Sequence, residues 1–163
     1  LEVGVSAEKI KEAIKTYKGV KRRFEYIIKT PELVYIDDYA HHPSELNALI
    51  ESIRHLFPGK KITLVFQPHL FSRTNDFMDA FAEVLAKVDD LYLLDIYPAR
   101  ELPMDGVTSL VLFDKVKLDS KKLTTKADLM NDLVTSQAEI MVTAGAGDID
   151  VFIESVKQML LSK

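Results

Sequence analysis

The sequence predicts an α/β fold, a Rossmann-like, three-layer domain whose mostly parallel sheet carries helices on both faces. Three observations predict it. Short apolar runs of strand length alternate with longer segments whose apolar residues recur every three or four positions. The short runs are apolar almost throughout, which is typical of parallel strands buried on both faces. The length of 163 residues fits one ordinary domain with a short appendage.

The first expected element is a helix from Ser6 to Lys18, which forms the appendage. Ser6 can serve as its N-cap, and Gly19 can adopt the left-handed conformation that ends a helix. The apolar stripe of this helix is narrow and consists of Ile10, Ile14 and Tyr17. A basic connector with Arg22 and Arg23 follows, and the regular alternation begins only near residue 33.

The strands and helices of the alternation follow from the spacing of apolar residues. Strands are expected at residues 33–36, 62–66, 91–96 and 139–143, with a weak strand from residue 123. Helices are expected at residues 43–57, 76–87, 107–116, 126–136 and 149–161. Pro43 suits the first position of its helix, where a missing N–H costs nothing. Phe77 and Phe81 begin the apolar stripe expected for the helix over 76–87.

Polar side chains follow the ends of four expected strands. The four loops are residues 37–42, 67–74, 97–101 and 144–148. The carboxyl ends of parallel strands meet at one edge of a sheet, and ligands of such folds bind outside that edge. Three of the four histidines lie in the first two loops, whereas His55 lies within a helix and is expected to face solvent. The sequence therefore predicts a binding site at this edge.

Single motifs in these loops leave alternatives open. Asp37, Asp38, His41 and His42 are ligand types that suit a divalent metal, although their spacing is not helical. Each aspartate, taken alone, is also explained by a capping role at a helix start. The Gly-Ala-Gly sequence at residues 145–147 fits either a tight turn or a loop that binds phosphate through free N–H groups.

Two residues of the second loop suit a small anionic substrate. Arg73 can grip a carboxylate with two parallel hydrogen bonds, and His69 can add a donor. The sequence has no G-x-x-x-x-G-K-[ST] loop for nucleotide phosphates and no G-x-S-x-G nucleophile elbow. Nothing in the chain is therefore expected to perform chemistry unaided.

Composition excludes several classes of protein. The 21 Lys and Arg residues against 25 Asp and Glu give a net charge of −4, so a nucleic-acid partner is not expected. The absence of cysteine excludes disulfides, thiolate zinc sites and a cysteine nucleophile, and it suits the cytoplasm. No apolar run approaches the roughly 20 residues of a membrane span, and no signal segment opens the chain, so a membrane is not expected either.

The polar loops resemble those of the Mur ligase family of peptidoglycan synthesis. Residues 37–45, Asp-Asp-Tyr-Ala-His-His-Pro-Ser-Glu, and residues 66–74, Phe-Gln-Pro-His-Leu-Phe-Ser-Arg-Thr, carry the resemblance. It continues in order through residues 19–24, 96–101, 106–109 and 145–149. Family members are longer and have three domains. The resemblance implies that residues 24–163 are the C-terminal domain, and that residues 1–23 are the last helix of the central ATPase domain plus the hinge.

Within the family, the chain is most similar to the branch that joins L-alanine to UDP-N-acetylmuramate. In that reaction the substrate carboxylate takes the γ-phosphoryl group of ATP to become an acyl phosphate, which the amine of L-alanine attacks. The resemblance implies that the whole enzyme uses ATP and Mg²⁺ together with its other two domains. It also implies that this fragment alone has no catalytic residue or metal site of its own, holds no cofactor and is inactive.

The resemblance also implies roles for single residues. The residues that match the L-alanine site are Tyr39, His69 and Arg73. Those that match the nucleotide site are Arg23 and Asp38. Additional candidates at the same edge are Asp37, His41, His42 and Arg100. Leu70 is a departure, because many members have arginine there, and it increases the importance of Arg73.

Two alternatives from other classes are kept. One is a metal-dependent phosphoesterase that uses the Asp37, Asp38, His41 and His42 cluster. It would be favoured by bound metal and by hydrolysis of a generic phosphodiester. The other is a stand-alone binding module, which a phosphate-binding loop upstream in the same reading frame would exclude.

Overall fold

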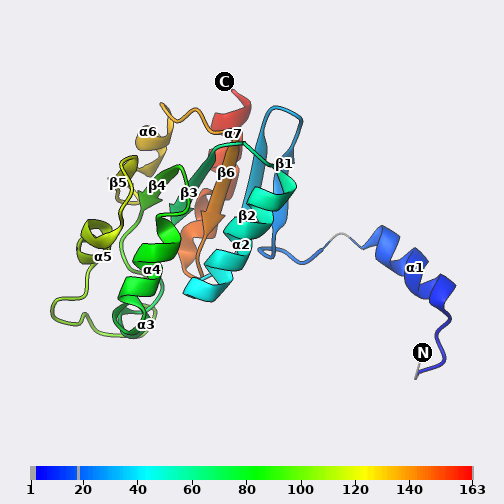
Figure 1. Ribbon diagram of the computed structural model, residues 1–163, viewed down its shortest axis with the longest axis horizontal. Coiled ribbons are helices and arrows are strands. Elements are labelled where there is room, and N and C mark those ends of the chain that lie inside the picture. The colour runs from blue at the N-terminus through cyan, green and yellow to red at the C-terminus, as the bar shows by residue number, and fades with distance from the viewer. Residues whose placement is uncertain (1–2, 18, 163) are drawn as a thin grey trace.

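The computed structural model describes residues 3–17 and 19–162 and shows six strands in a single sheet (Figure 1). The strands are β1 (Glu25–Lys29), β2 (Val34–Asp38), β3 (Ile62–Phe66), β4 (Asp90–Leu93), β5 (Lys121–Leu123) and β6 (Ile140–Ala144). Their spatial order is β1-β2-β6-β3-β4-β5, and only β1 runs antiparallel to its neighbour. The predicted α/β class with a mostly parallel sheet is confirmed.

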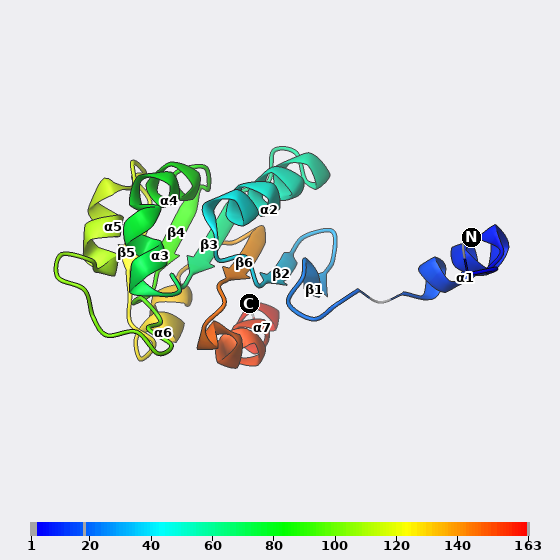
Figure 2. The same cartoon turned by 90° about the horizontal axis from the view of Figure 1, so that it is seen from below.

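Helices cover both faces of the sheet, as Figure 2 shows. One face carries α2 (Pro43–Leu56), α4 (Met78–Leu85) and α5 (Ser109–Lys115), and the other carries α6 (Leu129–Leu133) and α7 (Ile153–Leu161). Neighbouring strand residues alternate between the two cores, so Leu64 packs toward α2 and α4 whereas Val65 packs toward α6 and α7. Both residues are fully buried, which explains the continuous apolar runs of the sequence.

One strand was not predicted. β1 lies at the edge of the sheet and pairs only with β2, with an irregularity in register between Tyr26 and Ile28. Only Ile28 of this strand is buried. A half-exposed edge strand needs no continuous apolar run, so the pattern that marks the central strands is missing here.

The helix predicted over 76–87 is wrong in its boundaries. Two helices, α3 (Phe71–Asp76) and α4, occupy the region, and Phe77 lies between them with φ −119° and ψ 22°. Phe77 is 39% exposed and packs its ring at 4.5 Å from the ring of His42, so it does not belong to the buried stripe. The predicted polar loop over 67–74 therefore contains the whole first turn of α3.

Smaller corrections concern the ends of other elements. Thr108 is the N-cap of α5 and accepts from the N–H of Val111, so that helix begins at Ser109 and not at residue 107. The strand predicted over 91–96 is β4, which ends at Leu93. The last helix is preceded by a 3₁₀ turn, η1 (Asp148–Phe152). His55 is exposed, as expected.

The N-terminal helix α1 (Ala7–Thr16) stands apart from the sheet (Figures 1 and 2). Ser6 caps it as predicted, since its hydroxyl accepts from the N–H of Lys9. None of its residues is buried, and Ile14 is 67% exposed. The predicted end of this helix at Lys18 lies outside the described residues. No helix among the described residues is both long and apolar enough to cross a bilayer.

The difference in burial between Ile53 and Ile14 predicts that replacement by alanine lowers the free energy of unfolding at one position and leaves it nearly unchanged at the other. Ile53, on α2, is fully buried, so Ile53→Ala should lower the free energy of unfolding by about 2–5 kcal/mol through lost burial and a cavity. Ile14→Ala should change it by less than about 0.5 kcal/mol, because Ile14 contacts no core. Urea unfolding followed by circular dichroism measures both. Equal losses would contradict the description of α1 as unpacked.

Candidate functional site

The four polar loops lie together at one edge of the sheet. They follow β2, β3, β4 and β6, which are parallel neighbours, so their carboxyl ends meet at this edge. The turn before β1 joins them, because Glu25 pairs with Asp37 at the end of β2. The convergence expected from the sequence is therefore present.

The same edge holds unusual backbone conformations. Among the described residues, four that are not glycine have positive φ angles: Arg22 (56°), Phe24 (49°), Leu70 (73°) and Ala99 (52°). All four lie in the turns and loops of this edge. Such conformations are costly for residues with a Cβ and persist where surrounding contacts hold them, which is frequent at functional sites.

Asp37 is buried within this edge and is not free to bind a ligand. Its carboxylate accepts from the Thr143 hydroxyl at 2.5 Å and from Nε of Arg22 at 3.3 Å. The hydroxyl of Tyr35 in turn lies 3.2 Å from that of Thr143. Burial raises the pKa of Asp37 from 3.8 to about 6, although the bonds from Thr143 and Arg22 oppose this rise. Asp37 thus stabilises the edge from inside the protein and is not part of its exposed surface.

Asp38 joins two loops. One carboxylate oxygen accepts from the N–H of Phe24 at 2.6 Å, and the other accepts from the N–H of Ala40 at 2.7 Å. The side chain therefore fixes the turn before β1 against the loop after β2. Arg23 precedes Phe24 directly, so Asp38 determines where Arg23 is presented.

His42 caps α2. Its Nδ1 accepts from the N–H of Ser44, and the Glu45 side chain accepts from the N–H groups of His41 and His42, which completes a capping box. Burial alone would raise the pKa of Glu45, but these hydrogen bonds and the nearby His41 lower it. Histidine in place of serine or threonine conceals this capping box in the sequence.

His41 faces the site more directly than His42. Its Nδ1 lies 2.8 Å from the carbonyl oxygen of Tyr39, so Nδ1 carries the proton in that contact. Its ring lies 5.3 Å from the ring of Tyr39 and 6.0 Å from that of His69. The three aromatic rings of Tyr39, His41 and His69 thus form one group.

His69 and Arg73 form a pair across one turn of chain. The NH1 group of Arg73 donates to Nδ1 of His69 at 3.1 Å, and the His69 ring stacks on Tyr97 with centroids 5.7 Å apart. Burial, the charge of Arg73 and that of His41 lower the pKa of His69. The imidazole is therefore neutral, with its proton on Nε2, while Nε and NH2 of Arg73 remain available as a two-pronged donor.

Glu101 holds the turn that carries Arg73. Its carboxylate accepts from the N–H and the hydroxyl of Ser72, at 3.0 and 2.5 Å. These hydrogen bonds lower the pKa of Glu101. Neighbouring Arg100 is exposed, and no hydrogen bond or ion pair connects it to the rest of the described chain.

Arg23 and Tyr39 complete the group. Arg23 is exposed, and within the described residues no carboxylate pairs with it. Its guanidinium lies 5.4 Å from the centroid of the Tyr39 ring, and that of Arg22 lies 5.0 Å from it. An unpaired exposed guanidinium beside an aromatic ring suits an anionic ligand such as a phosphate.

The glycine loop after β6 is built for close packing. A Cβ at Gly147 would collide with the side chains of Gln67 and Tyr97, and one at Gly145 would lie 2.7 Å from the carbonyl oxygen of Gln67. Gln67 donates to Asp148, which also pairs with Lys126 at 2.6 Å. The two glycines therefore allow the loops after β3, β4 and β6 to touch. A cavity of about 340 Å³ lies beside them.

The Asp and His cluster does not form a metal site. Asp37 is bound internally, Asp38 joins two loops and His42 caps a helix. Within residues 3–17 and 19–162, no three His, Asp or Glu side chains are arranged to hold a metal ion. The phosphoesterase alternative has no support in this arrangement.

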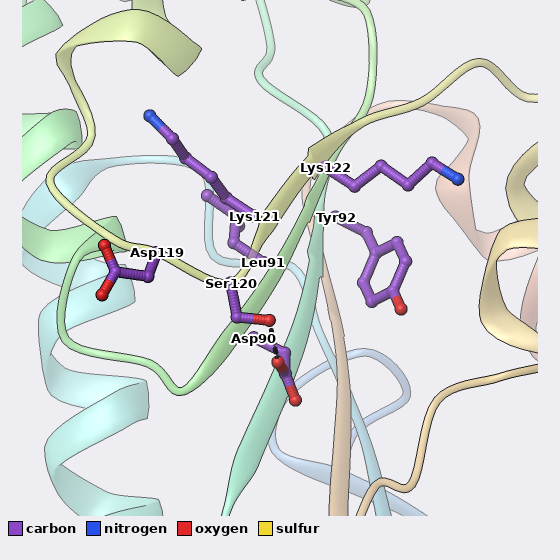
Figure 3. Close-up of a pocket in the computed structure, with 7 residues that line it drawn as sticks. All are labelled: Asp90, Leu91, Tyr92, Asp119, Ser120, Lys121 and Lys122. Atoms are coloured by element: carbon purple, nitrogen blue, oxygen red, sulfur yellow. Dashed lines mark hydrogen bonds between the residues drawn. The ribbon is translucent and has the colours of Figure 1, made fainter.

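A second cavity, of about 210 Å³, lies at the amino ends of β4 and β5, on the opposite edge of the sheet (Figure 3). Four of its polar side chains are engaged internally: Ser120 donates to Asp90, Lys122 pairs with Asp132, and Lys121 donates to main-chain carbonyls. Figure 3 shows Lys121 and Lys122 pointing away from each other. The candidate functional groups therefore belong to the carboxyl edge.

Comparisons with known proteins show the family of this chain. The family model described as "Mur ligase, glutamate ligase domain" matches residues 22–152. This chain belongs to the Mur ligase family. It is 54% identical, over 94% of its length, to a UDP-N-acetylmuramate–L-alanine ligase of Cytophaga hutchinsonii, and 53% identical over 96% to that of Flavobacterium johnsoniae. It covers 33% and 35% of those proteins, about one third of their length.

Solved structures that match this chain include a longer chain and a single domain. The UDP-N-acetylmuramate–alanine ligase of Thermotoga maritima matches with a TM-score of 0.78 and 28% identity, over 99% of this chain and 35% of that one. A domain from a Haemophilus ducreyi protein matches with a TM-score of 0.58 over 86% of this chain and 98% of that one. At 17% identity, the second likeness concerns the fold alone.

The buried Asp37 predicts a specific dependence of stability on pH. Its pKa is raised in the folded domain, so the stability that its protonated form contributes is present below about pH 4 and lost as pH rises through about 6. The shift from 3.8 to about 6 corresponds to about 3 kcal/mol. The difference in free energy of unfolding between wild type and Asp37→Asn should therefore fall by up to about 3 kcal/mol between pH 4 and 7.5.

Urea unfolding at several pH values tests this prediction. The asparagine side chain of the Asp37→Asn variant does not titrate, and other carboxylates contribute equally to both proteins, so the difference isolates Asp37. A difference that stays constant from pH 4 to 7.5 would show that Asp37 titrates normally.

Proposed function

We propose that this domain is the C-terminal part of a ligase that joins L-alanine to UDP-N-acetylmuramate with ATP. The observation that carries the proposal is identity of more than half over 94% of the chain with a protein of that name. The polar loops that distinguish the domain all lie within this match. The reaction would take place in the cytoplasm, where ATP is available.

The L-alanine site, in this proposal, consists of Tyr39, His69 and Arg73. Nε and NH2 of Arg73 would hold the carboxylate of alanine, because NH1 is already bound to His69. Nε2 of the neutral His69 would add a hydrogen-bond donor, and its orientation is held by the stack on Tyr97. His41, next to Tyr39 and His69, would border the same site.

The nucleotide site, in this proposal, receives one cation from this domain. Arg23 has the exposed, unpaired guanidinium that fits a phosphate, and Asp38 would act by fixing the turn that carries it. Mg²⁺, when bound, would neutralise phosphate charge during phosphoryl transfer. Asp37 and Asp38 are both engaged by internal donors, so the carboxylates for that metal are expected from another domain.

We further propose that residues 1–23 are the last helix of the preceding ATPase domain and the hinge. Ile10 and Ile14 of α1 and Tyr17 at its C-cap are exposed, which fits a helix whose packing partner belongs to that domain. The 163-residue chain alone is then expected to form no amide bond, because the phosphate-binding loop lies elsewhere. ATP-dependent amide formation by the purified chain would contradict this division of labour.

Substitution of Arg73 tests the alanine site in the whole ligase. Arg73→Ala should raise the KM for L-alanine about 10- to 100-fold, since a charge-assisted pair of hydrogen bonds is lost. Arg73→Lys should recover only part of this loss, because an ammonium group cannot form the two-pronged contact. The KM for ATP should stay within about twofold. Unchanged alanine kinetics in Arg73→Ala would remove this residue from the site.

Substitution of Asp38 tests the nucleotide side. Asp38→Ala releases the N–H groups of Phe24 and Ala40, so it should raise the KM for ATP more than that for L-alanine. Asp38→Asn keeps one acceptor oxygen, so its KM for ATP should lie between those of the wild type and Asp38→Ala. Asp79→Ala is the control, since the Asp79 side chain is 83% exposed and its ion pair is with Lys115 of α5. Normal ATP kinetics in Asp38→Ala would refute the role given to Asp38.

A further inference from the structure

The side chain of Arg22 is held inside the carboxyl edge, although a basic connector is usually solvated. Its NH2 group donates to the carbonyl oxygen of Gly145 at 2.6 Å, and NH1 donates to that of Gly147 at 3.4 Å. Nε contacts Asp37 at 3.3 Å, and NH1 lies 3.6 Å from the carboxylate of Asp150. Only 18% of the side chain is exposed. All three nitrogen atoms of the guanidinium are therefore occupied.

The main chain of Arg22 is held as firmly as its side chain. Its N–H donates to the Glu25 carboxylate at 2.8 Å, and its carbonyl accepts from the N–H of Tyr39 at 2.7 Å. The φ angle is 56°, a conformation that residues with a Cβ rarely adopt. These contacts fix the turn before β1 to the loop after β2.

The guanidinium also orients the glycine loop. The carbonyl groups of Gly145 and Gly147 point toward Arg22, and none of the described peptide bonds is cis. In a trans peptide the N–H of the next residue points the opposite way, so the N–H groups of Ala146 and Asp148 are turned away from Arg22. Arg22 thus determines the side on which this loop presents its donors.

Arg22 and Arg23 differ in burial, in side-chain contacts and in the sign of φ. Arg23 is exposed and pairs with no carboxylate among the described residues, whereas Arg22 is enclosed by contacts to four segments. Both guanidinium groups lie over the ring of Tyr39. The enclosed arginine therefore holds the ring and the turn, and the exposed one is free to meet a ligand.

We propose that Arg22 is a positioning residue of the ligase site, and this rests on the function proposed above. It fixes three parts of the site in one arrangement: the turn that presents Arg23, the ring of Tyr39 and the glycine loop. Arg22 does not contact substrate. Its loss should therefore loosen the nucleotide side and the alanine side together, whereas loss of Arg23 should affect the nucleotide side alone.

The first experiment uses the 163-residue chain and does not depend on any activity. Amide hydrogen exchange followed by NMR is compared in wild type, Arg22→Ala and the double variant Arg22→Ala with Asp37→Asn. The double variant removes the buried carboxylate that would otherwise lose its cation, so it should fold where Arg22→Ala fails. Exchange should rise at least tenfold at Tyr39 and Gly145 and stay within twofold at Leu64 in β3. Lys21→Ala, an exposed neighbouring cation, should match wild type.

The second experiment measures kinetics in the whole ligase with the same variants. The double variant should raise the KM for both ATP and L-alanine by about tenfold, with kcat within about threefold, whereas Arg23→Ala should raise only the KM for ATP. Arg22→Lys should show a smaller rise in both KM values, because one ammonium group can reach one carbonyl oxygen.

The outcomes separate the two proposals. Unchanged exchange at Tyr39 and Gly145 in the double variant overturns the role of Arg22, whatever the enzyme does. Faster exchange with unchanged KM values also overturns it, since the loops would then move without consequence for the site. A wild-type protein that makes no alanine amide refutes the proposed function alone, and the exchange data still decide whether Arg22 holds the loops.

Discussion

The buried carboxylate of Asp37 is the constraint on which the carboxyl edge depends. It is the only fully buried carboxylate among the residues that the structure describes. A buried carboxylate is tolerated only when donors surround it, and here Thr143 and Arg22 supply them. Thr143 lies in β6, and Arg22 lies in the turn before β1. The need to solvate one charge thus joins the turn before β1, β2 and β6.

Much of the polarity that marks this edge in the sequence serves the protein itself. Asp38 and Glu45 accept main-chain N–H groups, His42 caps α2, and Glu101 holds Ser72. Among the described residues, these contacts leave some donors without an internal hydrogen bond, including the guanidinium of Arg23, two nitrogen atoms of Arg73 and Nε2 of His69. A dense network of internal hydrogen bonds keeps these free donors in fixed positions, which is what binding a small ligand requires.

The sequence predicted the central strands well because their environment is uniform. Ile62–Phe66 is buried at every position, so the apolar run and the strand coincide. β1 and α3 were missed for the opposite reason: β1 is an edge strand with one buried residue, and α3 has only Thr74 buried. The regular spacing of apolar residues in the sequence reflects which side chains are buried. An element with few buried side chains therefore shows no such spacing.

The site could be placed from the sequence only as a set of loops. The adjacent pairs Arg22 and Arg23, and Asp37 and Asp38, look equivalent in the sequence, and the structure gives the two members of each pair different roles. The φ angle of 56° at Arg22 turns its side chain inward while Arg23 points to solvent. Gly145, more than 100 positions away, accepts from Arg22, and Thr143, also more than 100 positions from Asp37, donates to the carboxylate that Arg22 contacts. No local pattern encodes these contacts.

The charge of the free groups has a consequence for the chemistry. The donors that this edge offers are cations or neutral N–H groups, and the carboxylates of Asp37, Asp38 and Glu101 are already bound. An edge of this kind stabilises anions and offers little to a metal ion. If the domain serves the ligase proposed above, its part in the reaction is to hold the carboxylate of the amino acid and a phosphate of the nucleotide. The metal ligands and the phosphate-binding loop then belong to the domain that faces it, so the site is complete only where the two domains meet.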